Sequence, residues 1–376
     1  MANIEINVAE NGTTTLATAG KYCDRNIDVV VEVAGGGGAD IPEEAYIFSG
    51  KCAYTFASDK WKWFLEPNLD KVQFTKITDA SNMFDGSTYE SLGNVEINFL
   101  DASSGMSSIF NNMASLKEAN FKFTGNIKGN TIGLFSNCRS LKTVGNIFQD
   151  LDMSYFATQT SSQQQQMFYN CYSLREIDKH IWDNIVIART ASYGHLYSSL
   201  YQECNSLDEA YIPIYTAKTY NDNCFSNTVN YCNRLKNVLF ATNEDGTPIV
   251  VNWKNQNFDL GASVGYASIS GKNNILNYSG ITADKEVKDD ATYQALKNDA
   301  DWFTTDMYYS RYNHDSAVNT INSLPDTSAY ITANGGANTI KFRGLAGSYT
   351  DGGAINTLTE AEIAVAAAKG WTVTLS

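Results

Sequence analysis

An internal repeat between residues 41 and 256 constrains the fold more than any other feature of the sequence. Its reference position is a leucine that recurs at intervals of 24, 25, 33, 33 and 28 residues. These leucines are Leu92, Leu116, Leu141, Leu174, Leu207 and Leu235. Three positions later the chain has a small or β-branched apolar residue, namely Val95, Ala119, Val144, Ile177, Ala210 and Val238. Three and six positions before the last five leucines lie two further columns, Met113, Cys138, Cys171, Cys204 and Cys232, and Phe110, Phe135, Phe168, Tyr201 and Val229.

A fixed pattern at this period predicts a solenoid, because each unit is too small to bury its apolar face without stacked neighbours. Within one unit, Phe168, Cys171 and Leu174 are three residues apart, which places them on one face of a short helix or 3₁₀ turn. A short strand around Ile177 then stacks on its counterparts in neighbouring units. We therefore expect an α+β repeat solenoid of short strands and helical or 3₁₀ turns.

The cysteines of the repeat are expected to be buried structural residues. The chain has seven cysteines and no CxxC pair, so we expect the thiols to be reduced. Small buried side chains are the usual role of free Cys. A metal or redox site is the alternative, but Met113 occupies the same column and supplies no thiolate. Asn137 and Asn170, one residue before two of these cysteines, are candidate caps for local backbone groups. We expect no metal and no cofactor.

The repeat region is flanked by segments of different character. Residues 1–34 contain two strand-like runs, 4–8 and 27–33, and an Asn11-Gly12 turn signal, which predict a small β module for attachment or oligomerisation. So short a module buries little core alone, so we expect it to pair with another copy or another protein. Residues 35–40 contain four glycines and predict a linker. A phosphate-binding loop is excluded because no Gly-Lys-Ser/Thr follows.

Residues 257–376 are expected to form a small α+β region that closes the solenoid. Three helices are predicted, beginning at Asp290, at Asp315 as N-cap, and after the capping box Thr359–Glu362. The last ends at Lys369-Gly370, and the residues after it predict a terminal strand. A repeat array needs an atypical terminal unit to cover its exposed core.

Composition excludes several classes of function. The net charge is −14 and the isoelectric point about 4.7, which disfavour nucleic acids and anionic membranes as partners. No apolar run reaches the roughly 18 residues of a transmembrane helix. The first residues have neither the basic nor the apolar region of a secretory signal, so we expect none.

No catalytic residues are assigned. The chain has three histidines, His180, His195 and His314, none with a second His or a Cys three or four residues away. Signature motifs of zinc proteases, serine hydrolases, nucleotide-binding loops and EF-hands are missing. Acidic pairs, Asp289 with Asp290 and Asp299 with Asp301, would serve glycosidase chemistry only if they met in a cleft, and a solvated helix face is the default.

A binding surface is the more plausible use of this chain. Solenoids present extended curved surfaces, and Tyr, Asn, Gln and Ser suit contacts with sugars or proteins. The polar insertion Thr158–Gln166 lengthens one repeat, and such insertions project from one face. Tyr193, Tyr197 and Tyr201 are four residues apart, which indicates either an aromatic stripe or core packing, and Tyr201 already belongs to a core column.

The repeat resembles the BspA-type leucine-rich repeat. Its fullest copy is Met167–Ile177, with a second close match at Leu134–Leu141 and weaker ones at 82–84 and 201–207. The resemblance implies a leucine-rich-repeat-like fold over about 45–240, in a family found among bacterial surface adhesins and phage virion proteins. Residues 4–33 look like a β module at the start of phage tail and fibre proteins, and residues 358–371 like the end of phage proteins with these repeats.

Together these features predict a non-enzymatic phage virion protein, either a tail-fibre receptor-binding protein or a head-fibre decoration protein. We expect residues 1–34 to bind other virion proteins, the solenoid to bind a host-surface glycan or protein, and the whole to be a homo-oligomer, with a trimer as the guess by analogy. The predicted localisation is the virion. A bacterial adhesin is the alternative, and a polysaccharide depolymerase the third.

Overall fold

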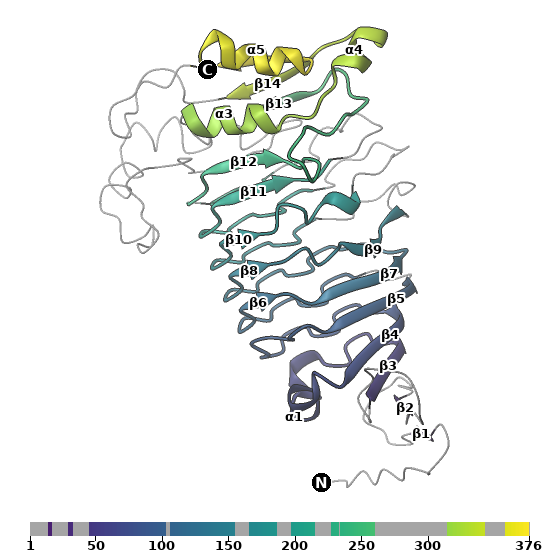
Figure 1. The fold of residues 1–376 in the computed structure, drawn as a ribbon. Coiled ribbons are helices and arrows are strands. Elements are labelled where there is room, and N and C mark those ends of the chain that lie inside the picture. Colours follow the sequence, from purple (N-terminus) through teal and green to yellow (C-terminus); the bar gives the residue numbers. More distant parts are fainter. Residues whose placement is uncertain are drawn as a thin grey trace, which may run out of the picture.

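The computed structural model is a parallel β-solenoid of about six turns with little helix, followed by a small α+β C-terminal region (Figure 1). It describes residues 14–16, 29–32, 45–102, 106–154, 165–185, 197–214, 227–232, 234–259, 314–342 and 358–375. The coils stack along one axis from β3 to β12, with the C-terminal helices at the far end (Figure 1).

One side of the solenoid is a seven-stranded sheet in the order β1-β2-β3-β4-β5-β7-β9. Its strands are β1 (Thr14–Leu16), β2 (Val29–Glu32), β3 (Ala45–Lys51), β4 (Val72–Asp79), β5 (Glu96–Ala102), β7 (Lys122–Ile127) and β9 (Asp150–Asp152). Pairing is parallel from β3 onward, because each coil returns to the same side in the same direction.

The other side carries shorter parallel strands, each of which follows a repeat leucine. β6 (Glu118–Ala119), β8 (Thr143–Val144) and β10 (Glu176–Ile177) form one sheet, and β11 (Glu209–Ile212) and β12 (Asn237–Phe240) form another. The strand expected around Ile177 is therefore confirmed, with Ile177 beside Val144 in register.

The segment that starts two residues before the aromatic residue and runs to the leucine of each repeat is not the helix or 3₁₀ turn that the spacing predicted. It is a chain of tight turns in which two residues, four apart, have positive φ. These pairs are Tyr54 and Ser58, Asn82 and Gly86, Ser108 and Asn112, Gly133 and Asn137, Gln166 and Asn170, Ser199 and Glu203, and Asn227 and Tyr231. A left-handed residue at every fourth position interrupts any helix, since helices require right-handed backbone throughout.

Because of the left-handed residues, the backbone N–H groups of the turns alternate between partners in the same coil and partners in the next coil. The N–H of Cys138 donates within its own coil to the carbonyl of Phe135 at 3.1 Å. The N–H of Phe135 donates instead to the carbonyl of Met167 in the next coil at 2.8 Å, and that of Asn137 to Tyr169 at 2.8 Å. The turns thus contribute hydrogen bonds between coils as strands do, so the backbone is paired around much of each coil.

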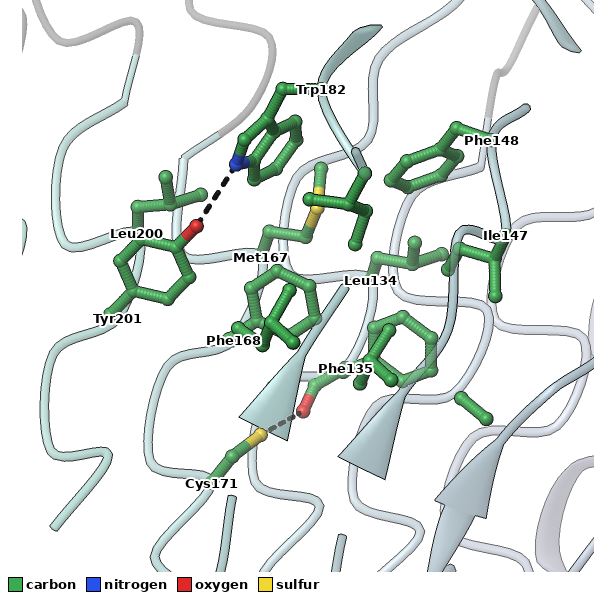
Figure 2. Close-up of a cluster of buried hydrophobic side chains, with 14 of the residues drawn as sticks. Leu134, Phe135, Ile147, Phe148, Met167, Phe168, Cys171, Trp182, Leu200 and Tyr201 are labelled. Atoms are coloured by element: carbon green, nitrogen blue, oxygen red, sulfur yellow. Dashed lines mark hydrogen bonds between the residues drawn. The ribbon is translucent and has the colours of Figure 1, made fainter. Parts of the chain in front are cut away.

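A stack of aromatic rings runs through the core. Phe56, Phe84, Phe110, Phe135, Phe168 and Tyr201 lie one above another, one from each coil. Their centroids are 5.1 to 5.7 Å apart and their planes within 19° of parallel. All six rings are fully buried. Figure 2 shows three of them, Phe135, Phe168 and Tyr201. The aromatic column read from the sequence is therefore a continuous structural element that fixes the register between coils.

A second aromatic column, not predicted, packs beside the first. It consists of Phe99, Phe123, Phe148 and Trp182. The indole N–H of Trp182 donates to the hydroxyl of Tyr201 at 3.1 Å and to the carbonyl of Tyr211 at 2.8 Å, which joins the two columns (Figure 2). The spacing of these four aromatic residues along the chain varies because the connections between coils differ in length. The sequence pattern therefore does not reveal this second column.

Helix α3 (His314–Ser323) covers the last coil by taking the place of a further strand. Thr320 Oγ1 donates to the carbonyl of Val238 at 2.8 Å, Ser316 Oγ donates to that of Lys236, and Ser323 Oγ accepts from the N–H of Phe240 at 3.0 Å. One helical turn rises about 5–6 Å and two strand residues about 6.6 Å, so hydroxyls spaced three or four apart meet alternate strand residues. The predicted helix exists, but Asp315 lies in its first turn and not at the N-cap.

The remaining C-terminal elements form a three-stranded parallel sheet with two more helices. The strands are β13 (Asn257–Asp259), β14 (Asn338–Phe342) and β15 (Trp371–Leu375), and the helices are α4 (Ser328–Asn334) and α5 (Glu360–Ala368). The capping box at Thr359 and Glu362 and the terminal strand are confirmed. The helix predicted from Asp290 lies outside the described residues.

At the other end, β2 pairs antiparallel with β3, and β1 pairs with β2. The strand predicted within 27–33 is therefore present and extends the solenoid sheet. The run at 4–8, the Asn11-Gly12 turn and the linker at 35–40 lie outside the described residues. The division into a module at 1–34, a solenoid at 41–256 and a closing region at 257–376 stays a prediction.

Candidate interaction surface

The turns of successive coils line up into one continuous surface, which we call the turn face. It consists of polar residues at or near the left-handed positions, namely Asp85, Asn111, Asn112, Ser136, Asn137, Tyr169, Asn170, Tyr172, Gln202 and Glu203. Ser136 and Asn170 are buried beneath it, and the other eight are half-buried or exposed. In four repeats two of them follow the buried aromatic ring, and in each of these pairs at least one side chain is half-buried or exposed. The repeat that builds the core therefore also builds a polar ladder along the outside.

Hydrogen bonds between coils hold the turn face in a defined arrangement. The amide groups of Asn111 and Asn112 both donate to Asp85 Oδ1 at 3.0 Å. Asn170 Nδ2 donates to Asn137 Oδ1 at 2.7 Å in the preceding coil. The two asparagines that we expected to cap local backbone groups thus bond to each other, and their backbones are left-handed at φ 64° and 63°.

An aromatic side chain on the turn face is held by charged neighbours from both adjacent coils. The Arg139 guanidinium lies 5.8 Å from the centre of the Tyr172 ring, and Tyr172 OH donates to Glu203 Oε2 at 3.2 Å. Burial, followed by the Glu203 carboxylate, raises the pKa of the Tyr172 hydroxyl, which therefore stays a donor at neutral pH. Such pre-organised polar and aromatic groups suit recognition of a polar ligand.

The repeat cysteines are structural, and they also donate hydrogen bonds between coils. Cys138, Cys171, Cys204 and Cys232 donate from Sγ, at 3.0 Å in each case, to the carbonyl oxygens of Phe110, Phe135, Phe168 and Tyr201 respectively. Figure 2 shows the bond from Cys171 to Phe135. Burial raises the pKa of the Cys171 thiol to about 12, so it remains protonated. Near neutral pH this thiol is therefore not a thiolate nucleophile.

The other titratable candidates are dispersed. His180 Nδ1 lies 3.0 Å from Asp183 Oδ2 within one coil, and His314 Nε2 lies 2.9 Å from Glu362 Oε1 in the C-terminal region. Within the described ranges, no three His, Cys, Asp or Glu side chains gather closely enough to hold a metal ion. His195 and the acidic residues Asp289, Asp290, Asp299 and Asp301 fall outside the described ranges.

The proposed tyrosine stripe is a core feature as far as the structure describes it. Tyr197 and Tyr201 are fully buried, whereas Tyr193 lies outside the described residues. Most of the insertion Thr158–Gln166 is also outside them. Gln166 has a left-handed backbone and starts the next turn segment, so this end of the insertion belongs to the repeat itself.

One exposed feature was missed in the sequence. Trp61 and Trp63 flank Lys62 at the first helix, α1 (Lys62–Leu65), and Trp63 is 69% exposed. The signal was present as three aromatic residues within four positions, 61–64, but it occurs once and so does not enter a repeat pattern.

Comparison with known proteins gives no family assignment. No protein-family model, no curated protein and no solved structure matches the chain. Among the helices that the structure describes, none has the length and apolar character needed to span a bilayer.

Proposed function

We propose that this protein is a non-enzymatic virion appendage of a phage, which displays its solenoid to bind a host surface. The single observation that carries the proposal is the turn face, a polar ladder repeated along a rigid stack of coils. Repetition suits a surface ligand that is itself extended or repetitive, because several weak contacts then act together. The resemblance of the repeat to the BspA type, with members among adhesins and phage virion proteins, supports this reading.

The proposal places residues 1–34 at the attachment to other virion proteins. The pairing of β2 with β3 supports it, because this pairing carries the sheet out to β1, the end strand among the described residues, and the edge of a sheet is a common place for a further chain to pair. Assembly into a homo-oligomer, with a trimer as the expected state, is part of the same proposal. A tail-fibre receptor-binding protein and a head-fibre decoration protein are its two forms.

The alternative is a bacterial surface adhesin, which uses the same turn face on a cell instead of a particle. The virion and adhesin proposals can be distinguished with phage particles purified from a lysate of the strain or phage that carries the gene. Mass spectrometry is expected to find the chain in the particles, and immunogold labelling places it on tail or head. Recovery of the chain only from intact, unlysed cells would overturn the virion proposal in favour of the adhesin.

A depolymerase is the third candidate, and the acidic pairs that would serve it, Asp289 with Asp290 and Asp299 with Asp301, lie outside the described residues. Incubation of the protein with host-surface polysaccharide, followed by an assay for new reducing ends, tests it. We expect no increase over a heat-denatured control. A time-dependent increase would contradict the non-enzymatic part of the proposal.

A further inference from the structure

An aromatic cluster at the N-terminal end of the solenoid has the properties of a small-ligand platform. The rings of Trp61 and Trp63 stack with centroids 6.4 Å apart and planes 23° from parallel. Trp61 is half-buried, whereas Trp63 is 69% exposed. An exposed indole gives up the stabilisation that burial of so large a ring would provide, so its position on the surface needs a reason.

The cluster is fixed firmly to the first coil. Phe64 contacts the edge of Trp63 at 5.9 Å between centroids and that of Tyr46 in β3 at 4.8 Å. Between the two indoles, Lys62 Nζ donates to Thr88 Oγ1 at 2.8 Å and to the carbonyl of Thr88 at 3.0 Å, which ties α1 to the second coil. A ligand that stacks on Trp63 therefore meets a ring that is already ordered, and little entropy is lost on binding.

The size of the cluster favours a small ring over a protein partner. Its strongly exposed member is the single side chain Trp63, and an aromatic side chain buries about 150–250 Å² at most. A stable protein interface needs about 800 Å² from each partner. One indole face instead matches the apolar C–H face of one sugar ring in area.

The charges around the cluster favour an uncharged ligand. Residues 59–71 carry three acidic side chains, Asp59, Glu66 and Asp70, and three basic ones, Lys60, Lys62 and Lys71. The segment is therefore neutral, and Lys62 is already engaged with Thr88 and lies 3.8 Å from Glu66. The whole chain carries −14 and repels anionic ligands from the remaining surface.

We propose that Trp63, supported by Trp61, is a carbohydrate-stacking site for a neutral pyranose of a surface glycan. The flat C–H face of the sugar lies on the indole, and Lys60 and Glu66, exposed polar side chains of the same segment, are the candidate hydrogen-bond partners of its hydroxyls. The biological meaning of the site rests on the proposed function, since it names the class of host ligand. It adds a second site, separate from the turn face.

The test is titration of the full-length protein with maltoheptaose, cellohexaose and mannohexaose, followed by tryptophan fluorescence and calorimetry. Hyaluronan oligosaccharide serves as the charged comparison. At least one neutral oligosaccharide is expected to bind and to change the fluorescence, while hyaluronan is not. Trp63→Ala is expected to weaken that binding about tenfold or more, and Trp63→Phe is expected to weaken it less. Val250→Ala, which truncates a 63% exposed apolar side chain outside both proposed binding surfaces, is the matched control and is expected to leave it unchanged.

Four outcomes would overturn this proposal without touching the virion proposal, and the first three concern binding. They are failure of all three neutral oligosaccharides to bind, binding that Trp63→Ala leaves at wild-type strength, and equal binding of hyaluronan. A fourth is loss of a wild-type oligomer in Trp63→Ala by light scattering, which would assign the indole to a subunit contact. Presence of the chain in purified particles is a separate readout, so the two proposals fail separately.

Discussion

Gly125 shows how closely adjacent coils approach at single residues. It lies in β7 opposite Phe99 of β5, with φ +78°, and a Cβ at this position would overlap the carbonyl oxygen of Phe99. Gly145, one residue after β8, has only ordinary van der Waals neighbours at 3.5 Å or more and no positive φ. Both positions are simply glycine in the sequence, but only at Gly125 do the backbone conformation and a close neighbour exclude a larger residue.

We expect Gly125→Ala to lower the free energy of unfolding by about 2–5 kcal/mol, because backbone strain and steric overlap add at this site. Gly145→Ala, the matched control, is expected to stay within about 0.5 kcal/mol of wild type or to gain slightly. Denaturant titration followed by circular dichroism measures both. Equal effects of the two substitutions would contradict the geometry of the β5–β7 pairing.

The buried thiols predict resistance to alkylation and sensitivity to alkali. Near neutral pH, iodoacetamide is expected to leave Cys52, Cys138, Cys171, Cys204 and Cys232 unmodified in the folded protein and to modify them in concentrated guanidinium chloride, as read by peptide mass spectrometry. The pKa of the Cys171 thiol rises from 9.0 to about 12 on folding, so above pH 9 only the unfolded state loses this proton. Stability should therefore fall as the pH rises from 9 towards 12. Alkylation of the native thiols would show that the coils open.

Among the elements, helix α3 ends the stack of coils. Its hydroxyl side chains form hydrogen bonds with the backbone of β12, where a further strand would have paired through its backbone. A bare strand edge invites pairing with other chains, and the hydroxyls of α3 satisfy that edge without presenting a new one. Thr320 is the central contact, because its hydroxyl is buried and donates to Val238 from inside the interface.

Thr320→Val is expected to lower the free energy of unfolding by about 1–3 kcal/mol, since it leaves the Val238 carbonyl buried without this donor. Thr332→Val in α4 is the control, because its hydroxyl bonds only to the carbonyl of Ser328 at the surface. Chemical denaturation of both variants tests the pair. A loss at Thr332 as large as at Thr320 would mean that the hydroxyls act within their helices and not on the solenoid edge.

The link between α3 and α5 predicts a pH dependence. Hydrogen bonding to Asp315 and then to Glu362 raises the pKa of His314 above its ordinary value of 6.5, so the charged imidazole is favoured in the folded state. Its stabilising effect is fully present below pH 6.5 and is lost as the pH rises through the raised pKa. The difference in melting temperature between wild type and His314→Gln is therefore expected to shrink from pH 6 to pH 8. A constant difference would show that the ring acts through packing alone.

At the scale of the whole molecule, the structural features that could be predicted are those whose residues repeat along the sequence. The columns of Phe135, Cys138 and Leu141 recur in register, so their burial and the stacking of coils were predictable. The left-handed turns were not, because Asn, Gly, Ser, Gln, Glu and Tyr all occupy these positions and no single residue type marks them. The turn face and Trp63 depend on how turns orient side chains and on one local cluster, and neither leaves a periodic signal.

Oligomeric state is the whole-molecule prediction. Light scattering after gel filtration is expected to give an oligomer for the full chain and a smaller species for residues 41–376, because residues 1–34 are proposed to assemble the particle. Removal of β2 also uncovers β3, so Lys substitutions on β3 outward positions provide a control against aggregation of that edge. Equal oligomers for both chains would place the assembly contacts in the solenoid or the C-terminal region.

The direction of the hydrogen bonds between coils has a mechanical consequence. Bonds such as Phe135 N–H to Met167 carbonyl run from coil to coil, along the axis of the stack. A force that pulls the two ends apart therefore acts at the same time on all the hydrogen bonds between two neighbouring coils. Each such junction between neighbouring coils carries the same force. Tension applied this way is limited by the weakest junction, and extension proceeds one coil at a time. A solenoid built in this way lengthens in steps under load and dissipates the applied force before it breaks.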